Sequence, residues 1–279
     1  MRPEQERRPS LGWQIGRILL AGSSRQAFLD HRWIGRLLPA APERWRRSLA
    51  LRVLSLSPHY FIYQWDRYPA DWSRKRVLEA ESERNRQSRR EIAEAILAPR
   101  IPANATVLDF GCGPGFLVRE VLEFAGQVVA VDVSSGTLAC ARVLNPCPTY
   151  RLNRAGDLPV RDETIDVVYS IAVFQHIEAV NWPTYFEDFA RILRPGGRGI
   201  CQFAAADREP VKYVEPTGLR ARYSLRFEER GSDEVAAALS AAGFVDVRVE
   251  PIAASINDDV GRQHLATVSQ AGMTRCRLP

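Results

Sequence analysis

A small set of residues has the types and spacing needed for binding and proton transfer. Gly111, Gly113 and Gly115 alternate directly after a short apolar run. Glycine is needed where a strand turns sharply into a helix while the backbone approaches a ligand, because a Cβ would occupy that space. Asp132 ends the next apolar run, where a carboxylate can accept hydrogen bonds from both hydroxyls of a ribose. His176 is a candidate proton acceptor because its unperturbed pKa is close to neutral.

The elements that must position these residues alternate between strand and helix. The apolar runs 106–110 and 127–131 predict two buried strands, and the helical spacing of 116–125 predicts the crossover helix between them. Ligands of open α/β sheets lie beyond the carboxyl ends of the strands. The G-x-G-x-G spacing differs from the G-x-G-x-x-G of dinucleotide sites, because Phe116 stands where the third glycine would be. A nucleoside without a pyrophosphate is therefore the favoured ligand.

The segment from Val107 to Phe116, together with Asp132, resembles motif I and its acidic successor in class I S-adenosylmethionine-dependent methyltransferases. The strand predicted at 165–170 and the Leu-Arg-Pro-Gly-Gly turn at 193–197 are further points of similarity. The resemblance covers residues ~90–272. It implies an α/β, Rossmann-like fold with a seven-stranded, mostly parallel sheet, and S-adenosylmethionine as the cofactor.

The resemblance also implies which residues bind that cofactor. The expected set is Asp109, Gly111, Gly113, Gly115, Asp132, Val133, Asn153, Asp157 and Ser170. The glycines would face the methionine part and Asp132 the ribose. Asn153, or else Asp157, would meet the adenine amino group. Asp109 would lie under the loop and hold its amides or the amino group of the ligand.

Two arginines are candidates for the methionine carboxylate, because residues just ahead of motif I often hold it in the resembled family. Arg84 and Arg86 lie in that part of the sequence. For both, a solvated helix face is the favoured interpretation.

His176 follows the fourth predicted strand in the sequence Phe-Gln-His, close to where a methyl acceptor must lie. In the small-molecule branch of the resembled family, a histidine in this position is proposed to take the proton of the acceptor. Methyl transfer can also proceed by positioning alone. General base, substrate orientation and a structural role therefore all stay open for His176. Structural roles are expected for His31, His59 and His264.

Further strands and helices follow from hydrophobic periodicity and turn residues. A long polar helix, or two, is expected at 74–97, with a capping box at Ser88 and Glu91 that would start a fresh helix at Arg89. Ser232 is the expected N-cap of the last helix. The other expected helices are 134–144, 181–193 and 232–242, and the other expected strands are 150–152, 199–203, 244–249 and 264–270, the last antiparallel.

Residues 1–73 form an N-terminal extension outside the resemblance, and residues 74–279 form the methyltransferase domain. Residues 1–100 carry 20 Lys and Arg against 11 Asp and Glu, with interspersed aromatic residues. A helical cap over the substrate is the favoured interpretation, with short helices at 25–38 and 44–56. Peripheral contact with an anionic lipid surface, a nucleic-acid patch and a plain packing extension are the alternatives. The charge excess is mild for nucleic acid, which is disfavoured.

Composition sets the remaining expectations for the 279-residue chain. No run of 18 apolar residues is present, so a membrane span and a cleaved signal are not expected. The five cysteines (Cys112, Cys140, Cys147, Cys201, Cys276) lack metal or disulfide spacing, which favours reduced thiols in the cytoplasm and no metal.

The acceptor is expected to be a small molecule. Oxygen of a natural product or sugar-like hydroxyl is favoured, with the 204–231 segment shaping its pocket. Carbon or nitrogen of a lipid or isoprenoid-type acceptor, and a cofactor-binding pseudo-enzyme, are the alternatives. The sequence leaves the oligomeric state open.

Overall fold

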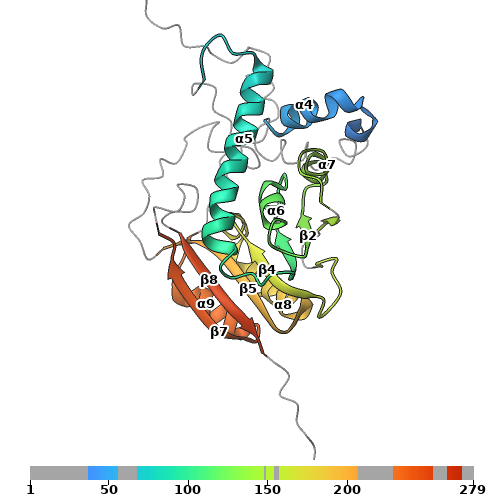
Figure 1. Cartoon of the computed structure of the whole chain (residues 1–279). Helices are drawn as coiled ribbons and strands as arrows, with labels where there is room; N and C mark the ends of the chain where they lie inside the picture. The colour runs from blue at the N-terminus through green and yellow to red at the C-terminus, as the bar shows by residue number, and fades with distance from the viewer. Residues whose placement is uncertain are drawn as a thin grey trace, which may run out of the picture.

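The computed structural model describes residues 37–55, 68–147, 149–153, 157–206, 229–253 and 263–271. Its centre is a twisted sheet in the strand order β3-β2-β1-β4-β5-β8-β7, with β6 paired to β5 (Figure 1). The strands are β1 (Thr106–Phe110), β2 (Gln127–Asp132), β3 (Thr149–Leu152), β4 (Ile165–Ser170), β5 (Leu193–Ala205), β6 (Glu229–Arg230), β7 (Phe244–Pro251) and β8 (His264–Gln270).

The sheet confirms the predicted mixed topology. Strands β3, β2, β1, β4 and β5 run parallel, and β8 is antiparallel to both β5 and β7. All seven expected strands are present in the described part of the chain. One further strand, β6, was not predicted; it has two residues and runs parallel to β5. β5 begins at Leu193 instead of at residue 199. Its register shifts opposite Ile165 and Val167, because the intervening Pro-Gly-Gly residues are accommodated as a bulge.

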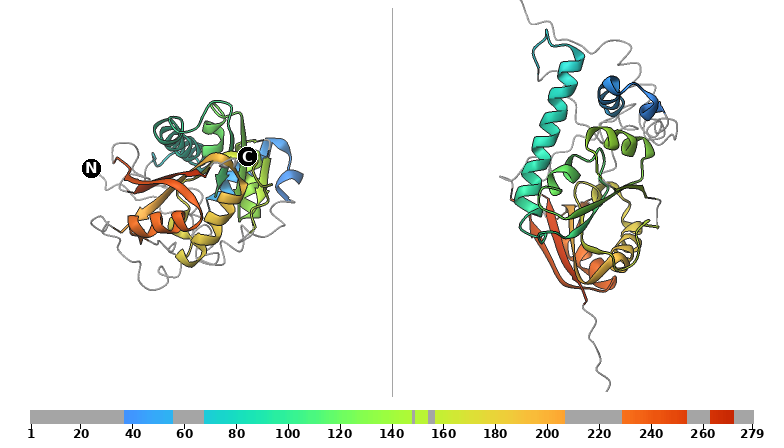
Figure 2. Two further views of the ribbon diagram at one scale, coloured as in Figure 1. Left: turned by 90° about the horizontal axis from the view of Figure 1, so that it is seen from below. Right: turned by 45° about the vertical axis from the view of Figure 1, so that its right-hand side comes forward.

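Helices cover the two faces of the sheet (Figure 2). One core layer joins the sheet to α5 (Arg74–Ile92), η2 (Ala93–Leu97), α6 (Phe116–Val121) and α7 (Ser135–Leu144). The other joins it to α8 (Trp182–Ile192) and α9 (Ser232–Ala241). Short 3-10 turns, η3 (Phe174–His176) and η4 (Ala179–Asn181), precede α8. No helix among the described residues has the length and apolarity that crossing a bilayer requires.

Two predicted helix N-caps are wrong. The Ser88–Glu91 capping box does not begin a new helix, because α5 runs unbroken through it and continues as the π-helical turn η2. Packing of the buried Ile92 face on the sheet outweighs that local signal. The true cap is Ser73, whose side chain accepts from the Arg76 amide. Likewise, Gly231 is the N-cap of α9 and Ser232 is its first helical residue.

The N-terminal extension contributes α4 (Glu43–Leu54), as the sequence predicts for 44–56. Its Leu51 and Leu54 are buried in a small core with α5, α7 and Phe116, the first residue after the glycine loop. The helix predicted at 25–38 and the segment 207–228 lie almost wholly beyond the residues that the structure describes. Of the first, residues 37 and 38 are helical.

Candidate functional site

The glycine loop connects β1 to α6 with a backbone that only glycine accommodates. Gly111, Gly113 and Gly115 all have positive φ angles, of 80°, 53° and 78°. A Cβ on Gly111 would lie 2.3 Å from a methyl group of Val173, and one on Gly115 would lie 2.2 Å from the Tyr150 hydroxyl. The loop is therefore wedged between the segment after β4 and β3. This confirms the conformational reason for the three glycines.

Asp132, at the tip of β2, is tied to this loop. Its Oδ2 accepts the Gly113 amide at 2.9 Å, and its Oδ1 accepts the Ser134 amide at 2.8 Å. The side chain is only 5% exposed. These bonds fix the carboxylate and hold the loop against β2. Each carboxylate oxygen can accept more than one hydrogen bond, so the ribose role of Asp132 stays a prediction compatible with this geometry.

Asp109 lies on β1 directly beneath the loop and is 2% exposed. Its register neighbour on β4 is Tyr169. Burial raises the pKa of the Asp109 carboxyl to about 7, although the nearby Tyr169 hydroxyl and Arg89 charge act in the opposite direction. Asp109 Oδ2 and the Tyr169 hydroxyl are both buried without a hydrogen-bond partner of normal geometry in the described part of the chain. Buried polar groups of this kind commonly hydrogen-bond to a ligand or an ordered water.

Asn153 and Asp157, the two adenine candidates, differ in burial. Asn153 is 3% exposed, and its backbone N–H donates to the Asp132 carbonyl at 2.8 Å. The side-chain Oδ1 of Asn153 is buried and has no partner among the described residues. Asp157 is exposed. An unpartnered oxygen suits an amino-group donor, so the geometry favours Asn153. Val133, the residue after Asp132, is 53% exposed.

The segment after β4 carries the remaining candidates. The Ser170 hydroxyl donates to the Phe110 carbonyl at 3.2 Å, which ties the tips of β4 and β1 together. Ala172 then has a positive φ of 61°, and its amide donates to Gln202 Oε1 on β5. A non-glycine residue in this conformation is strained and needs such support. Gln202, which sequence reasoning missed, therefore shapes the turn that leads to His176.

His176 ends η3 and is partly exposed. Its amide donates to the Val173 carbonyl at 2.8 Å. Phe174, in the same turn, is fully buried among aromatic rings, which include Phe110 at 5.9 Å and Trp182 at 5.2 Å between centroids. This packing anchors η3, at whose end His176 lies. The preceding Gln175 is buried, and its Oε1 has no partner in the described structure.

The two arginine candidates for the methionine carboxylate are engaged elsewhere. Arg84 pairs with the fully buried Glu81 at 3.1 Å, and Arg86 pairs with Glu120 at 3.0 Å. The first pair lies within α5, and the second joins α5 to α6. Arg89, which the sequence did not single out, lies near enough to Asp109 for its charge to lower the pKa of that carboxyl.

The four described cysteines are free thiols. Burial raises the pKa of Cys140 and of Cys201 to about 12, and that of Cys112 above its usual range. Such thiols are poor nucleophiles. In the described part of the chain, no three His, Cys, Asp or Glu side chains come together as a metal site.

Together, the loop, the β2 carboxylate and the buried unpartnered oxygens form a polar cluster at the carboxyl edge of the parallel strands. A family model described as a methyltransferase domain matches residues 108–201, which contain every one of these parts. Residues 108–201 therefore belong to a methyltransferase domain of the class I, S-adenosylmethionine-dependent kind. The methyltransferase domain thus supplies the loop, the β2 tip and η3 from one continuous matched segment.

Similar proteins carry related names. The "Probable S-adenosylmethionine-dependent methyltransferase" of Mycobacterium tuberculosis is 30% identical over 161 residues, which are 57% of this chain and 55% of that protein. The demethylmenaquinone methyltransferase of Tropheryma whipplei is 33% identical over 122 residues, which are 42% of this chain and 47% of that protein. The chain thus spans about half the length of these curated relatives.

Solved structures support the same fold. A Pyrococcus horikoshii protein superposes with a TM-score of 0.56 at 19% identity, covering 78% of this chain and 98% of that one. The methyltransferase of Haloferax volcanii in complex with its Trm112 activator gives 0.55 at 20% identity, covering 70% and 95%. At these identities the likeness concerns the fold alone.

Proposed function

We propose that this protein binds S-adenosylmethionine at the polar cluster on the carboxyl edge of the parallel strands and transfers its methyl group to a small-molecule acceptor. The observation that carries the proposal is the pair of buried, unpartnered oxygens, Asp109 Oδ2 on β1 and Asn153 Oδ1 just after β3. Leaving such oxygens unsatisfied costs about 1–3 kcal/mol each. A ligand with donor groups at both ends would satisfy them.

The residues fit the cofactor part by part. The side-chain-free loop lets the methionine portion approach the backbone, and Asp109 would accept from its ammonium group. Asp132, held by two backbone amides, would accept from the ribose hydroxyls. Asn153 would accept from the adenine amino group. The cofactor supplies a methyl group on a sulfonium, which is activated for direct displacement by a nucleophile.

The acceptor would enter beside η3, where the partly exposed His176 lies. An oxygen acceptor is favoured, because the imidazole can take the proton of a hydroxyl as the new bond forms. A positioned general base contributes on the order of 10²- to 10⁴-fold in rate. The fixed turn at Ala172, supported by Gln202, would hold that imidazole in place.

A lipid or isoprenoid-type acceptor is the second candidate, and the segment from Leu37 through α4 provides the observation that favours it. Leu37, Trp45 and Leu49 are 55%, 57% and 37% exposed, and Arg44 and Arg52 are exposed beside them. Exposed tryptophan and leucine with arginine suit the surface of an anionic membrane. Relatives named for menaquinone and ubiquinone methylation are in keeping with this candidate.

Calorimetry with S-adenosylhomocysteine tests the binding half of the proposal. We expect saturable 1:1 binding that is weakened more than tenfold by Asp132→Ala and unchanged by Asp157→Ala, the exposed control. Equal losses in both variants would remove the ribose assignment. Methyl transfer is then measured with hydroxylated natural products and with quinone precursors as the acceptors. Binding without turnover on either acceptor class would instead support a cofactor-binding pseudo-enzyme.

A further inference from the structure

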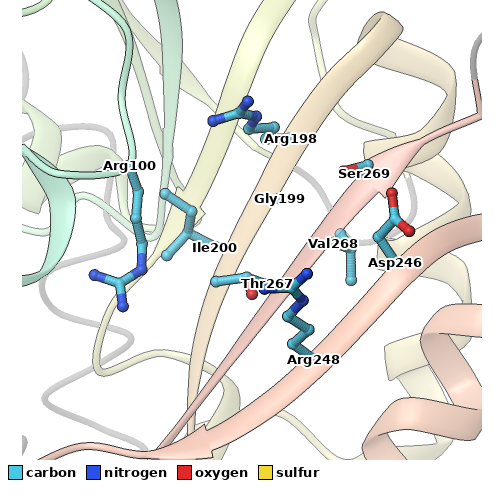
Figure 3. A pocket seen from close by; sticks show the side chains of 9 residues that line it. All are labelled: Arg100, Arg198, Gly199, Ile200, Asp246, Arg248, Thr267, Val268 and Ser269. Carbon is cyan, nitrogen blue, oxygen red and sulfur yellow. The ribbon is translucent and has the colours of Figure 1, made fainter.

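A second polar pocket lies at the opposite end of the sheet from the glycine loop (Figure 3). Its volume is about 380 Å³. The glycine loop, Asp132 and Asn153 belong to β1, β2 and β3, whereas this pocket is built on β5, β8 and β7. Its side-chain lining combines arginines with two hydroxyls: Arg100, Arg198, Asp246, Arg248, Thr267 and Ser269.

The cross-strand register places two of these arginines around the hydroxyls. Arg198 on β5 is the partner of Ser269 on β8, and Arg248 on β7 is the partner of Thr267. Residues two apart on a strand point to the same face, so Ser269 and Thr267 lie side by side between the arginines. Figure 3 shows the Arg248 guanidinium beside Thr267, and the Arg198 side chain farther along β5 with its guanidinium turned away from Arg248.

These two arginines are exposed and uncompensated. Neither Arg198 nor Arg248 makes an ion pair or side-chain hydrogen bond with another described residue. Arg100 differs, because its guanidinium is fixed by Glu250 at 2.9 Å and by the Ile96 carbonyl at 2.9 Å. It forms a wall of the pocket and leaves the other two arginines available to a ligand.

A β-bulge shapes the β7 side of the pocket. The register shifts between Val245 and Arg248, so that β7 carries one more residue than β8 over this stretch. Asp246, inside the bulge, has a positive φ of 52° and also lines the pocket. Bulges bend a strand and redirect its side chains. The bulge thus brings Asp246 and Arg248 to the same hollow.

We propose that this pocket is a binding site for a phosphate-type oxyanion, separate from the methyl-transfer site. Guanidinium groups bind such oxyanions through paired, charge-assisted hydrogen bonds. The Thr267 and Ser269 hydroxyls add neutral donors from the floor. Asp246 at the edge opposes a highly charged anion and limits the affinity. The pocket does not rest on the proposed methyl transfer, because it shares no residue with the polar cluster.

Side-chain NMR of the full chain tests the proposal. Inorganic phosphate is titrated at constant ionic strength set with sodium chloride, and the arginine Nε–Hε signals are followed. We expect saturable shifts of the Arg198 and Arg248 signals. Arg198→Gln and Arg248→Gln should each weaken the binding at least tenfold, whereas Asp246→Asn should strengthen it because a like charge is removed. Arg161→Gln, an exposed arginine distant in sequence from the pocket, is the matched control and should bind as wild type.

Three outcomes would overturn the proposal. Shifts that fail to saturate, or that sodium chloride alone reproduces, would show screening only. Equal weakening in Arg161→Gln would show a diffuse charge effect. Tighter binding of acetate than of phosphate would reject the phosphate assignment. Far-ultraviolet circular dichroism and thermal melting of each variant show whether it is folded. If either Arg198→Gln or Arg248→Gln does not fold, the other variant still tests the proposal.

Discussion

The pKa of Asp109 gives a quantitative test of the polar cluster. The carboxyl is 2% exposed, and burial raises its pKa from 3.8 to about 7. In the unfolded chain the same carboxyl ionises near its ordinary value. Between pH ~4 and ~7 the folded state therefore binds more protons than the unfolded state, and the free energy of unfolding falls as the pH rises. Keeping this group ionised in the folded state costs about 4 kcal/mol.

Asp109→Asn removes the titration while preserving the shape of the side chain. We expect the variant to gain stability relative to wild type as the pH rises, by up to about 4 kcal/mol between pH 4 and pH 8. Urea unfolding of both proteins at several pH values measures this difference. The comparison within each pH cancels the other titrating groups, and any constant effect of the substitution appears as an offset that does not vary with pH.

Asp157→Asn is the matched control, since it makes the same chemical change at an exposed position. Its stability difference from wild type should vary little with pH. If the Asp109→Asn difference were also constant to within about 1 kcal/mol across this range, the carboxyl would not be held in a desolvated environment. The reasoning about its unpartnered oxygen would then fail with it.

Three other substitutions test the loop, the β2 tip and η3. Asp132→Ala should weaken cofactor binding and should also lower the free energy of unfolding, measured in urea, by about 1–3 kcal/mol, because the Gly113 amide loses its acceptor. Unchanged stability would contradict the role of Asp132 in anchoring the loop. His176→Ala should lower kcat about 10²-fold or more with cofactor affinity retained, and near-normal kcat would leave it only a packing or orienting role. Gly115→Ala should cost at least about 1 kcal/mol more in thermal or urea unfolding than Gly196→Ala. Both glycines have φ near 79°, but only the first would place its Cβ against a buried atom; equal costs would refute the crowding at the loop.

Much of the polar cluster could be predicted from the sequence, because its main parts are local. The glycine spacing, the apolar run before it and the acid that ends the next run all lie between Thr106 and Asp132. Strands β4 and β8 also have the predicted bounds. Strand and turn signals act over a few residues, so they can be read along the chain. The capping box at Ser88 failed for the converse reason, since burial of one face of α5 outweighed a local preference.

Other features depend on contacts between distant segments. Gln202 supports Ala172 across the β4–β5 pair, and Asp109 faces Tyr169 across β1–β4. Strand alternation alone could have placed Tyr169 on a definite face, but no periodicity states which strands become neighbours. The sequence predicts a solvated helix face for Arg84 and Arg86, because it does not show which carboxylates lie near them. In the structure both arginines pair with buried partners, Glu81 and Glu120.

The sequence by itself determined the kind of loop, the acid at the tip of β2 and the order of strands and helices, because these follow from backbone sterics and hydrophobic spacing within short windows. Only the tertiary structure decided which polar atoms stay without partners and which arginines are neutralised. Both depend on desolvation and on distances between residues far apart in the chain. The pocket of Arg198 and Arg248 belongs to the second kind, because it exists only where β8 lies between β5 and β7.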